Sequence, residues 1–434
     1  MIKRIMISFL VMFWLIIQVG FGATDTAGIN DAKKAAVTLT DESNYFRVTL
    51  DYTKGAPRRQ IGEALGAAIL KAVPDYERLV DSYIAENIDS YEYPEAFYRV
   101  ADLKINLNRD YLDEIEGIAS QFSGGTKNVR RDGKISRDEF ILFNLFPDII
   151  RGTGCNFISV FGKRSATGKT ILSRALDWYA GDLNQLPQIQ ALITFKYPTT
   201  QICSIGYLGY QGIITGFSTN HIFAGIIDSQ TGAPFSSLGK RSYPLDLRWA
   251  LETKTTLKEA AAVMLDPHNN YAVNHVICMA DSQQGIIIEN NFSGQGTGGQ
   301  QVRRAIRNAG SRLNKGISWG IDNAVASVNS FLLKGNTDNQ TPNTYNTKRW
   351  KNLKKQLLAK GPVVTREELK EVAVYDDGAP GTFADSGDLY NRMTLHLVIF
   401  EPDTFSLEIF FHPRNSRQSP ADPKFIKVTG FIHD

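Results

Sequence analysis

A cysteine, an arginine and an aspartate lie close together near the middle of this 434-residue chain. Cys155 follows Gly154 at the head of one apolar run, and Arg174 and Asp177 lie in the next such run. A cysteine acts as a nucleophile through its thiolate, and a neighbouring guanidinium favours that form. A carboxylate nearby can hold and orient the base that takes the thiol proton. These residue types therefore predict a cysteine nucleophile.

The base for this thiol is not evident, because no histidine adjoins Cys155 in the sequence. If the chain were cut between Gly154 and Cys155, the freed α-amino group would have a reference pKa of about 7.7–8.0. Such an amine could take the thiol proton near neutral pH, with Asp177 holding the ammonium and Arg174 favouring the thiolate. The alternative is a buried strand cysteine beside a local Arg174–Asp177 ion pair.

A hairpin would bring these residues together. The runs on either side of Ser165–Gly168 predict two antiparallel strands joined by a polar turn. With the turn centred on Ala166, Asp177 lies opposite Cys155. Arg174 and Asp177 would face opposite sides of an ideal strand, so a bulge or twist must bring both to the site.

The pattern of apolar residues changes at Cys155. Residues from about 30 to 150 show helical spacing, as in the runs 59–70 and 111–119. From Cys155 onward, short β-rich runs alternate with a few helical intervals, such as 257–265 and 348–359. Many strands with few helices predict a layered α+β domain over residues 155–434, preceded by a mainly helical prosegment over 30–154.

The first residues have the form of a targeting segment. Lys3 and Arg4 precede an apolar run from Ile5 to Val19, and small residues follow it. This run is shorter than the roughly 20 residues of a membrane span, so it predicts a secretory signal peptide over residues 1–23. An uncleaved anchor is the alternative. We therefore expect a secreted or periplasmic protein.

Composition excludes some classes of function and leaves others open. The net charge of +3 gives no argument for a nucleic-acid partner. The three cysteines are too few for a disulfide framework. Because Cys203 and Cys278 lie in strand-like runs, we expect them to be buried, with a disulfide between them as the alternative.

Residues 128–139 resemble a calcium-binding loop in part. Gly133 and Glu139 fit the twelve-residue EF-hand pattern, but Arg130 stands where an oxygen ligand is needed. A degenerate loop is the preferred interpretation, and weak calcium binding the alternative. The six histidines show no metal-ligand spacing.

The motifs around Cys155 resemble the self-processing N-terminal-nucleophile (Ntn) cysteine amidases. This group includes acid ceramidase, N-acylethanolamine acid amidase and the penicillin acyl-transferring enzymes. The resemblance extends over about residues 45–412. It is carried by Phe143–Pro147, Gly154–Cys155, Gly168–Lys169, Arg174–Trp178 and Leu208–Phe217.

The resemblance assigns roles to further residues. Asp228 takes the place of a catalytic acid that is typically glutamate. Asn329 corresponds to the oxyanion-hole asparagine, and Arg349 to the arginine at a helix start. With Cys155, Arg174 and Asp177, these complete the predicted catalytic set. Two departures, Asn156 for threonine and Ala175 for asparagine, put the substrate class in question more than the mechanism.

The resemblance also implies a fold and an activity. The fold would be an αββα sandwich, and self-cleavage would leave a two-subunit heterodimer. The substrate would be a small-molecule or lipid N-acyl amide of the ceramide or N-acylethanolamine type, with no cofactor and no metal. A lipid substrate would allow peripheral contact with a membrane. The alternatives are an acyltransferase and a non-enzymatic envelope or binding protein.

Overall fold

The computed structural model describes residues 36–150, 154–229, 236–292, 303–337, 344–376, 378 and 387–431. The predicted signal peptide over residues 1–23 lies outside these ranges. Among the described residues, no helix is long and apolar enough to cross a membrane.

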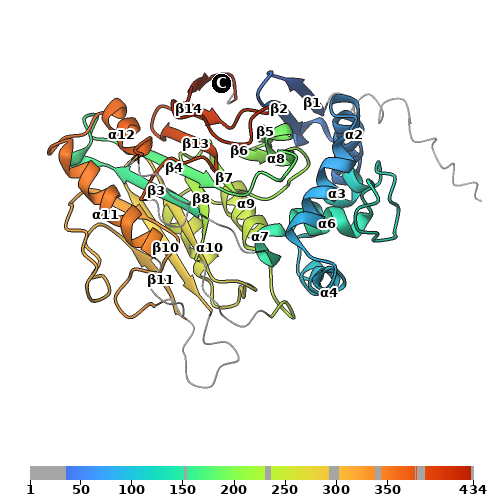
Figure 1. Ribbon diagram of the computed structural model, residues 1–434, viewed down its shortest axis with the longest axis horizontal. Helices are drawn as coiled ribbons and strands as arrows, with labels where there is room; N and C mark the ends of the chain where they lie inside the picture. The colour runs from blue at the N-terminus through green and yellow to red at the C-terminus, as the bar shows by residue number, and fades with distance from the viewer. Residues whose placement is uncertain are drawn as a thin grey trace, which may run out of the picture.

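Within the described residues, nine strands form the larger of two sheets (Figure 1). Their order across the sheet is β1-β2-β5-β6-β7-β8-β9-β10-β11. All neighbours are antiparallel except β2 and β5, which run parallel. The bounds are β1 (Val37–Asp41), β2 (Phe46–Asp51), β5 (Gln190–Lys196), β6 (Gln201–Tyr207), β7 (Thr215–Ser218), β8 (Phe223–Asp228), β9 (His275–Ala280), β10 (Gly285–Asn291) and β11 (Arg303–Arg307).

Six described strands form the second sheet, in the order β12-β3-β4-β13-β14-β15. The two sheets face each other, and Phe157 of the second stacks on Phe223 of the first with ring centroids 6.1 Å apart. The approach is close at Gly285, where an added Cβ would lie 2.1 Å from the Ser159 Oγ atom. The bounds are β3 (Gly154–Val160), β4 (Ile171–Asp177), β12 (Ala324–Ser327), β13 (Thr394–Glu401), β14 (Ser406–Phe411) and β15 (Ile426–Val428).

Helices cover the outer face of each sheet. Helices α9 (Tyr243–Thr253) and α10 (Leu257–Leu265) pack on the larger sheet. On the smaller sheet, α11 (Thr344–Ala359) and α12 (Arg366–Ala373) bury Trp350 and Leu369 in one core with Ile158 of β3. The order helix, sheet, sheet, helix confirms the predicted αββα sandwich (Figure 1).

The segment before Cys155 is mainly helical but also contributes two strands. Its helices lie at one end of the sandwich (Figure 1). The sequence prediction did not include β1 and β2, although Phe46, Val48 and Leu50 are buried in the alternating pattern of a strand. Because β2 pairs with β5, this segment belongs to the larger sheet. The helix bounds are α2 (Arg58–Ala72), α3 (Tyr76–Asn87), α4 (Glu92–Lys104), α5 (Arg109–Ala119), α6 (Arg137–Asn144) and α7 (Phe146–Ile149).

The loop over residues 128–139 is built around a carboxylate of the protein itself. Asp81 of α3 accepts hydrogen bonds from the backbone N–H of Arg131 (3.0 Å) and of Gly133 (2.7 Å). Arg130 turns away and donates to the Ile88 carbonyl (3.1 Å). The loop backbone thus folds around Asp81. Nowhere in the described ranges do three His, Cys, Asp or Glu side chains gather as a metal site.

Cys203 and Cys278 are both buried and unpaired. They lie on β6 and β9, which β7 and β8 separate in the sheet. The prediction of burial is confirmed, and a disulfide between them is not formed.

Candidate functional site

The hairpin of β3 and β4 forms as predicted, but its register differs by one residue. Gly154 pairs with Asp177, whereas the prediction placed Cys155 there; Cys155 pairs with Leu176. The reason is the loop, which runs from residue 161 to 170 and holds a 3-10 turn at Gly162–Arg164. An even number of loop residues centres the hairpin between two residues rather than on Ala166.

This register places Cys155 and Arg174 on the same face of the sheet. Arg174 pairs with Phe157, two residues from Cys155, so both side chains point toward the larger sheet. The Arg174 Nη2 atom lies 3.6 Å from the Cys155 Sγ atom and donates to the Ile226 carbonyl (2.8 Å). The guanidinium is therefore held between the thiol and strand β8.

Asp177 lies on the other face and joins the site through Arg349. The Arg349 Nη2 atom donates to Asp177 Oδ2 (2.7 Å), and Nη1 donates to the Cys155 carbonyl (2.9 Å). Thr394 Oγ1 donates to Asp177 Oδ1 (2.7 Å). A bulge is present, but it lies in β13, between Thr394 and His396, where this strand pairs with β4. Arg349 therefore supplies the link that the sequence argument sought in a bulge beside Arg174.

Asn329 holds the backbone nitrogen of the predicted nucleophile. The Cys155 N–H donates to the Asn329 Oδ1 atom (2.7 Å). The Asn329 Nδ2 atom donates to the Asp228 carbonyl (2.7 Å), and Asn346 Nδ2 donates to the Asn329 carbonyl (3.1 Å). The structure thus brings together the six predicted residues, which are Cys155, Arg174, Asp177, Asp228, Asn329 and Arg349. Their catalytic roles stay predictions.

Burial and charge act in opposite directions on this site. Burial raises the pKa of the Cys155 thiol above its ordinary value, while the Arg174 guanidinium lowers it. Burial likewise raises the pKa of Asp177, against the lowering effect of Arg349 and Thr394. Arg174 and Arg349 therefore supply the positive charge that a thiolate and a carboxylate need in a buried place.

His396 is a site residue that the sequence argument missed. Its Nε2 atom lies 3.1 Å from Arg174 Nη1 and 2.9 Å from Thr215 Oγ1. An arginine can only donate, so Nε2 is the acceptor and the ring is neutral. Burial and the Arg174 charge lower the pKa of His396 well below its ordinary value, in agreement with that assignment. A polar residue in the apolar run Thr394–Glu401 was the signal that could have found it.

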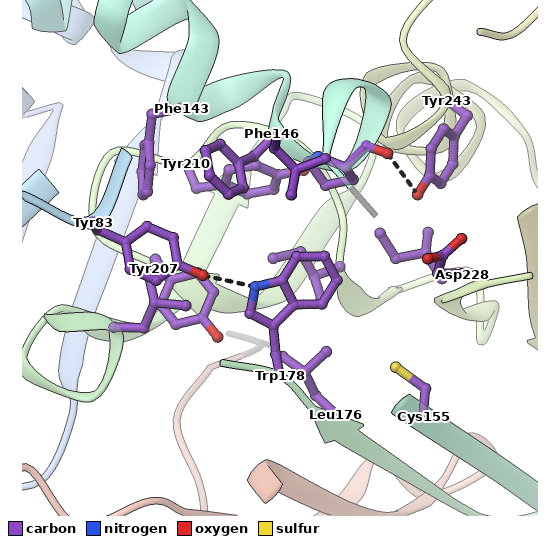
Figure 2. A pocket seen from close by; sticks show the side chains of 15 residues that line it. Tyr83, Phe143, Phe146, Cys155, Leu176, Trp178, Tyr207, Tyr210, Asp228 and Tyr243 are labelled. Atoms are coloured by element: carbon purple, nitrogen blue, oxygen red, sulfur yellow. Dashed lines mark hydrogen bonds between the residues drawn. The ribbon is translucent and has the colours of Figure 1, made fainter. Parts of the chain in front are cut away.

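The thiol opens into a narrow aromatic pocket (Figure 2). Figure 2 shows the Cys155 sulfur directed into it, with Asp228 and Trp178 above. The pocket encloses about 600 Å³ of empty space, and this volume includes the region at its mouth that is open to solvent. Both parts of the chain line it: Tyr83, Phe143 and Phe146 come from before Cys155, and Trp178, Tyr207 and Tyr210 from after it.

Comparisons with known proteins find no matching family model and no matching curated protein. Three similar solved structures are an N-acylethanolamine-hydrolyzing acid amidase ortholog of Caenorhabditis elegans, a conjugated bile acid hydrolase of Clostridium perfringens and a penicillin V acylase of Agrobacterium tumefaciens. Their sequence identities to this chain are 16%, 11% and 11%.

The C. elegans structure covers 60% of this chain and 100% of its own, with a TM-score of 0.43. The match to the bile acid hydrolase covers 64% of this chain and 97% of the hydrolase, with a TM-score of 0.35. The match to the acylase covers 63% of this chain and 86% of the acylase, with a TM-score of 0.37. The αββα assignment itself rests on the two facing sheets and the helices outside them.

Proposed function

We propose that this protein is an exported, self-processing cysteine amidase that hydrolyses linear N-acyl amides with an apolar, lipid-like chain. The single observation that carries the proposal is that both the thiol and the backbone nitrogen of Cys155 contact predicted site residues. Its thiol faces Arg174 in the pocket, while its backbone nitrogen donates to Asn329 Oδ1 at 2.7 Å. An enzyme that uses the nitrogen of its nucleophile as a base needs both atoms in the site.

Cleavage of the Gly154–Cys155 bond would convert this nitrogen into an amine beside the thiol. The amine takes the thiol proton, and the thiolate attacks the amide carbonyl, whose π electrons move to oxygen. Asn329 still has its second Nδ2 hydrogen to offer to that oxyanion. The amine then gives the proton to the leaving nitrogen as the C–N bond breaks.

Water completes the reaction. The amine removes a proton from water, which attacks the thioester, and the acid leaves as the thiol is restored. Arg174 stabilises the thiolate in each round, and Arg349 holds Asp177 and the Cys155 carbonyl in place. Asp228, across the pocket from the thiol, is proposed to contact the scissile amide (Figure 2).

The two pieces of a cut chain would stay associated. Strand β2 would remain paired with β5, and a buried ion pair also crosses between the pieces. Arg248 of α9 donates to Glu114 of α5 (2.6 Å), and Glu114 also accepts from Arg58 of α2 (2.6 Å). The pocket needs both pieces, because Tyr83, Phe143 and Phe146 form part of its wall.

The test is product analysis with N-acyl amides of increasing acyl length. We expect the wild-type protein to release the free acid and the free amine, and Cys155→Ala to release neither. Release by Cys155→Ala would contradict the proposal. Adding a second amine separates hydrolysis from acyl transfer, because transfer yields a new amide in place of the acid.

A further inference from the structure

The tyrosines that line the pocket are of two kinds (Figure 2). The Tyr83 hydroxyl accepts from Trp178 Nε1 (2.7 Å) and donates to the Tyr179 carbonyl (3.1 Å). The Tyr243 hydroxyl donates to the Pro147 carbonyl (3.4 Å). By contrast, the hydroxyls of Tyr207 and Tyr210 have no hydrogen-bond partner among the described residues.

Both unpartnered tyrosines are deeply buried, with exposed fractions of 5% for Tyr207 and 3% for Tyr210. A buried hydroxyl without a partner destabilises the folded state, whereas phenylalanine would fill the same space without that cost. Unsatisfied buried groups in native proteins therefore call for an explanation, and a ligand that satisfies them is one.

The turn that carries these two side chains is firmly held. Gly209 has a φ of +77°, and an added Cβ there would lie 2.8 Å from Phe140 and from the Tyr76 hydroxyl. Tyr76 donates to the Leu208 carbonyl (2.7 Å), and the Gln211 N–H donates to Asn144 Oδ1 (2.7 Å). All three of these partners belong to helices before Cys155, so those helices hold the backbone of the turn from which both tyrosine side chains extend.

Tyr207 lies within electrostatic reach of the reacting thiol. Burial raises the pKa of Tyr207, and the charges of Arg174 and Cys155 act on it in opposite directions. Burial also raises the pKa of Tyr210, so both hydroxyls keep their protons and can donate.

We propose that Tyr207 and Tyr210 are substrate-recognition residues whose hydroxyls bind a polar substituent of the amide substrate in this pocket. This inference rests on the proposed function. The preferred substrate is then an N-acyl amide that carries a hydroxyl or carbonyl on the portion filling the pocket, rather than a plain alkyl chain.

Thermal unfolding of the free protein tests whether the Tyr207 and Tyr210 hydroxyls lack hydrogen-bond partners. Tyr207→Phe and Tyr210→Phe should leave the unfolding temperature unchanged or raise it, because no bond is lost. Tyr83→Phe, the matched control in the same pocket, should lower it by about 1–3 °C. A loss as large in Tyr207→Phe and Tyr210→Phe as in Tyr83→Phe would overturn the proposal, because those hydroxyls would then have partners in the free protein.

Binding to the Cys155→Ala protein tests recognition without turnover. The probes are an N-acyl amide with a hydroxyl near the amide and its deoxy analogue, measured by calorimetry. We expect the hydroxylated amide to bind roughly 10- to 100-fold more tightly, and Tyr207→Phe in the same background to remove most of that preference.

Two outcomes are distinguishable. Equal affinity for both amides would overturn the recognition role and leave the amidase proposal standing. Binding of neither amide, together with no hydrolysis by the wild-type protein, would overturn the amidase proposal as well.

Discussion

Two fully buried arginines, Arg248 and Arg174, have contrasting surroundings. Arg248 has a full set of partners: the Glu114 carboxylate at 2.6 Å, the hydroxyls of Tyr197 and Tyr52, and the Gln211 side chain. Arg174 contacts no carboxylate among the described residues. Its partners are a thiol, a backbone carbonyl and the His396 ring, and its Nε atom has no partner in those ranges.

The contrast distinguishes a buried charge with a structural role, Arg248, from one with a proposed functional role, Arg174. A buried charge with a close counter-ion joins elements together, and Arg248 joins α9 to α5 across the predicted cut. A buried charge without one is costly, and such cost is typical of functional sites. Under the proposed function, Arg174 is the positive charge that stabilises the Cys155 thiolate.

The largest expected effect belongs to Arg248→Met. This change leaves Glu114 buried with only Arg58 as a counter-ion, so we expect a loss of about 3–5 kcal/mol in the free energy of unfolding. Chemical denaturation measures it. Loss of activity without loss of stability would place Arg248 with Arg174 and remove the contrast.

Arg174→Met should show the opposite pattern. We expect kcat/KM to fall roughly 100-fold or more, as for loss of one charge-stabilising donor, with the free energy of unfolding nearly unchanged. Arg174 lowers the pKa of Cys155, so the variant should form the thiolate at a higher pH than the wild type does. The rate at which iodoacetamide alkylates the thiol should therefore rise at a higher pH in the variant than in the wild type. An unchanged pH midpoint for alkylation would contradict this role.

Asp148 of α7 provides a third buried ionisable group for the comparison. Its Oδ1 accepts from the Tyr243 N–H (3.1 Å), and the neighbouring Ser242 hydroxyl also favours the charged carboxylate. Burial, with a smaller effect of Asp246, raises the pKa of Asp148 to about 8.

Because the pKa of a free aspartate is about 3.9, the folded state binds the extra proton between about pH 4 and pH 8. Stability is thus lost as the pH rises through that window. Asp148→Asn removes this loss, so we expect the variant to match the wild type in stability near pH 4 and to become increasingly more stable than the wild type as the pH rises to 8. Denaturation curves at the two pH values measure this, and an equal difference at both would contradict it.

The smallest effect is expected at His396, which positions Arg174. His396→Phe removes the acceptor for Arg174 Nη1, and we expect kcat to fall about tenfold with KM unchanged. His396→Gln keeps an acceptor and should restore part of kcat. A purely structural role would instead lower the unfolding temperature of both variants and leave kcat similar in each.

The sequence predicted the local parts of the site better than the distant ones. The predicted register of the β3–β4 hairpin differs from the observed one by a single residue, because a short loop limits the possible registers. The helix at Leu257–Leu265 has the predicted bounds, since its Thr256–Glu259 capping box is local.

The distant parts depend on the order of strands. The contact of His396 with Arg174 arises because β13 is inserted beside β4, and no local spacing records that neighbour. The same holds for β2, whose partner β5 lies beyond the predicted cut. Asp228, Asn329 and Arg349 could be found only through the resemblance to known enzymes, since they lie on β8, in the bend after β12 and on α11.

The most direct test of the account is whether the Gly154–Cys155 bond is cut. Intact mass and N-terminal sequencing of the purified full chain, beside Cys155→Ala as control, would decide it. We expect two associated chains in the wild type, one of them beginning at Cys155, and a single chain in Cys155→Ala. A wild-type chain that stays whole and hydrolyses N-acyl amides would contradict it.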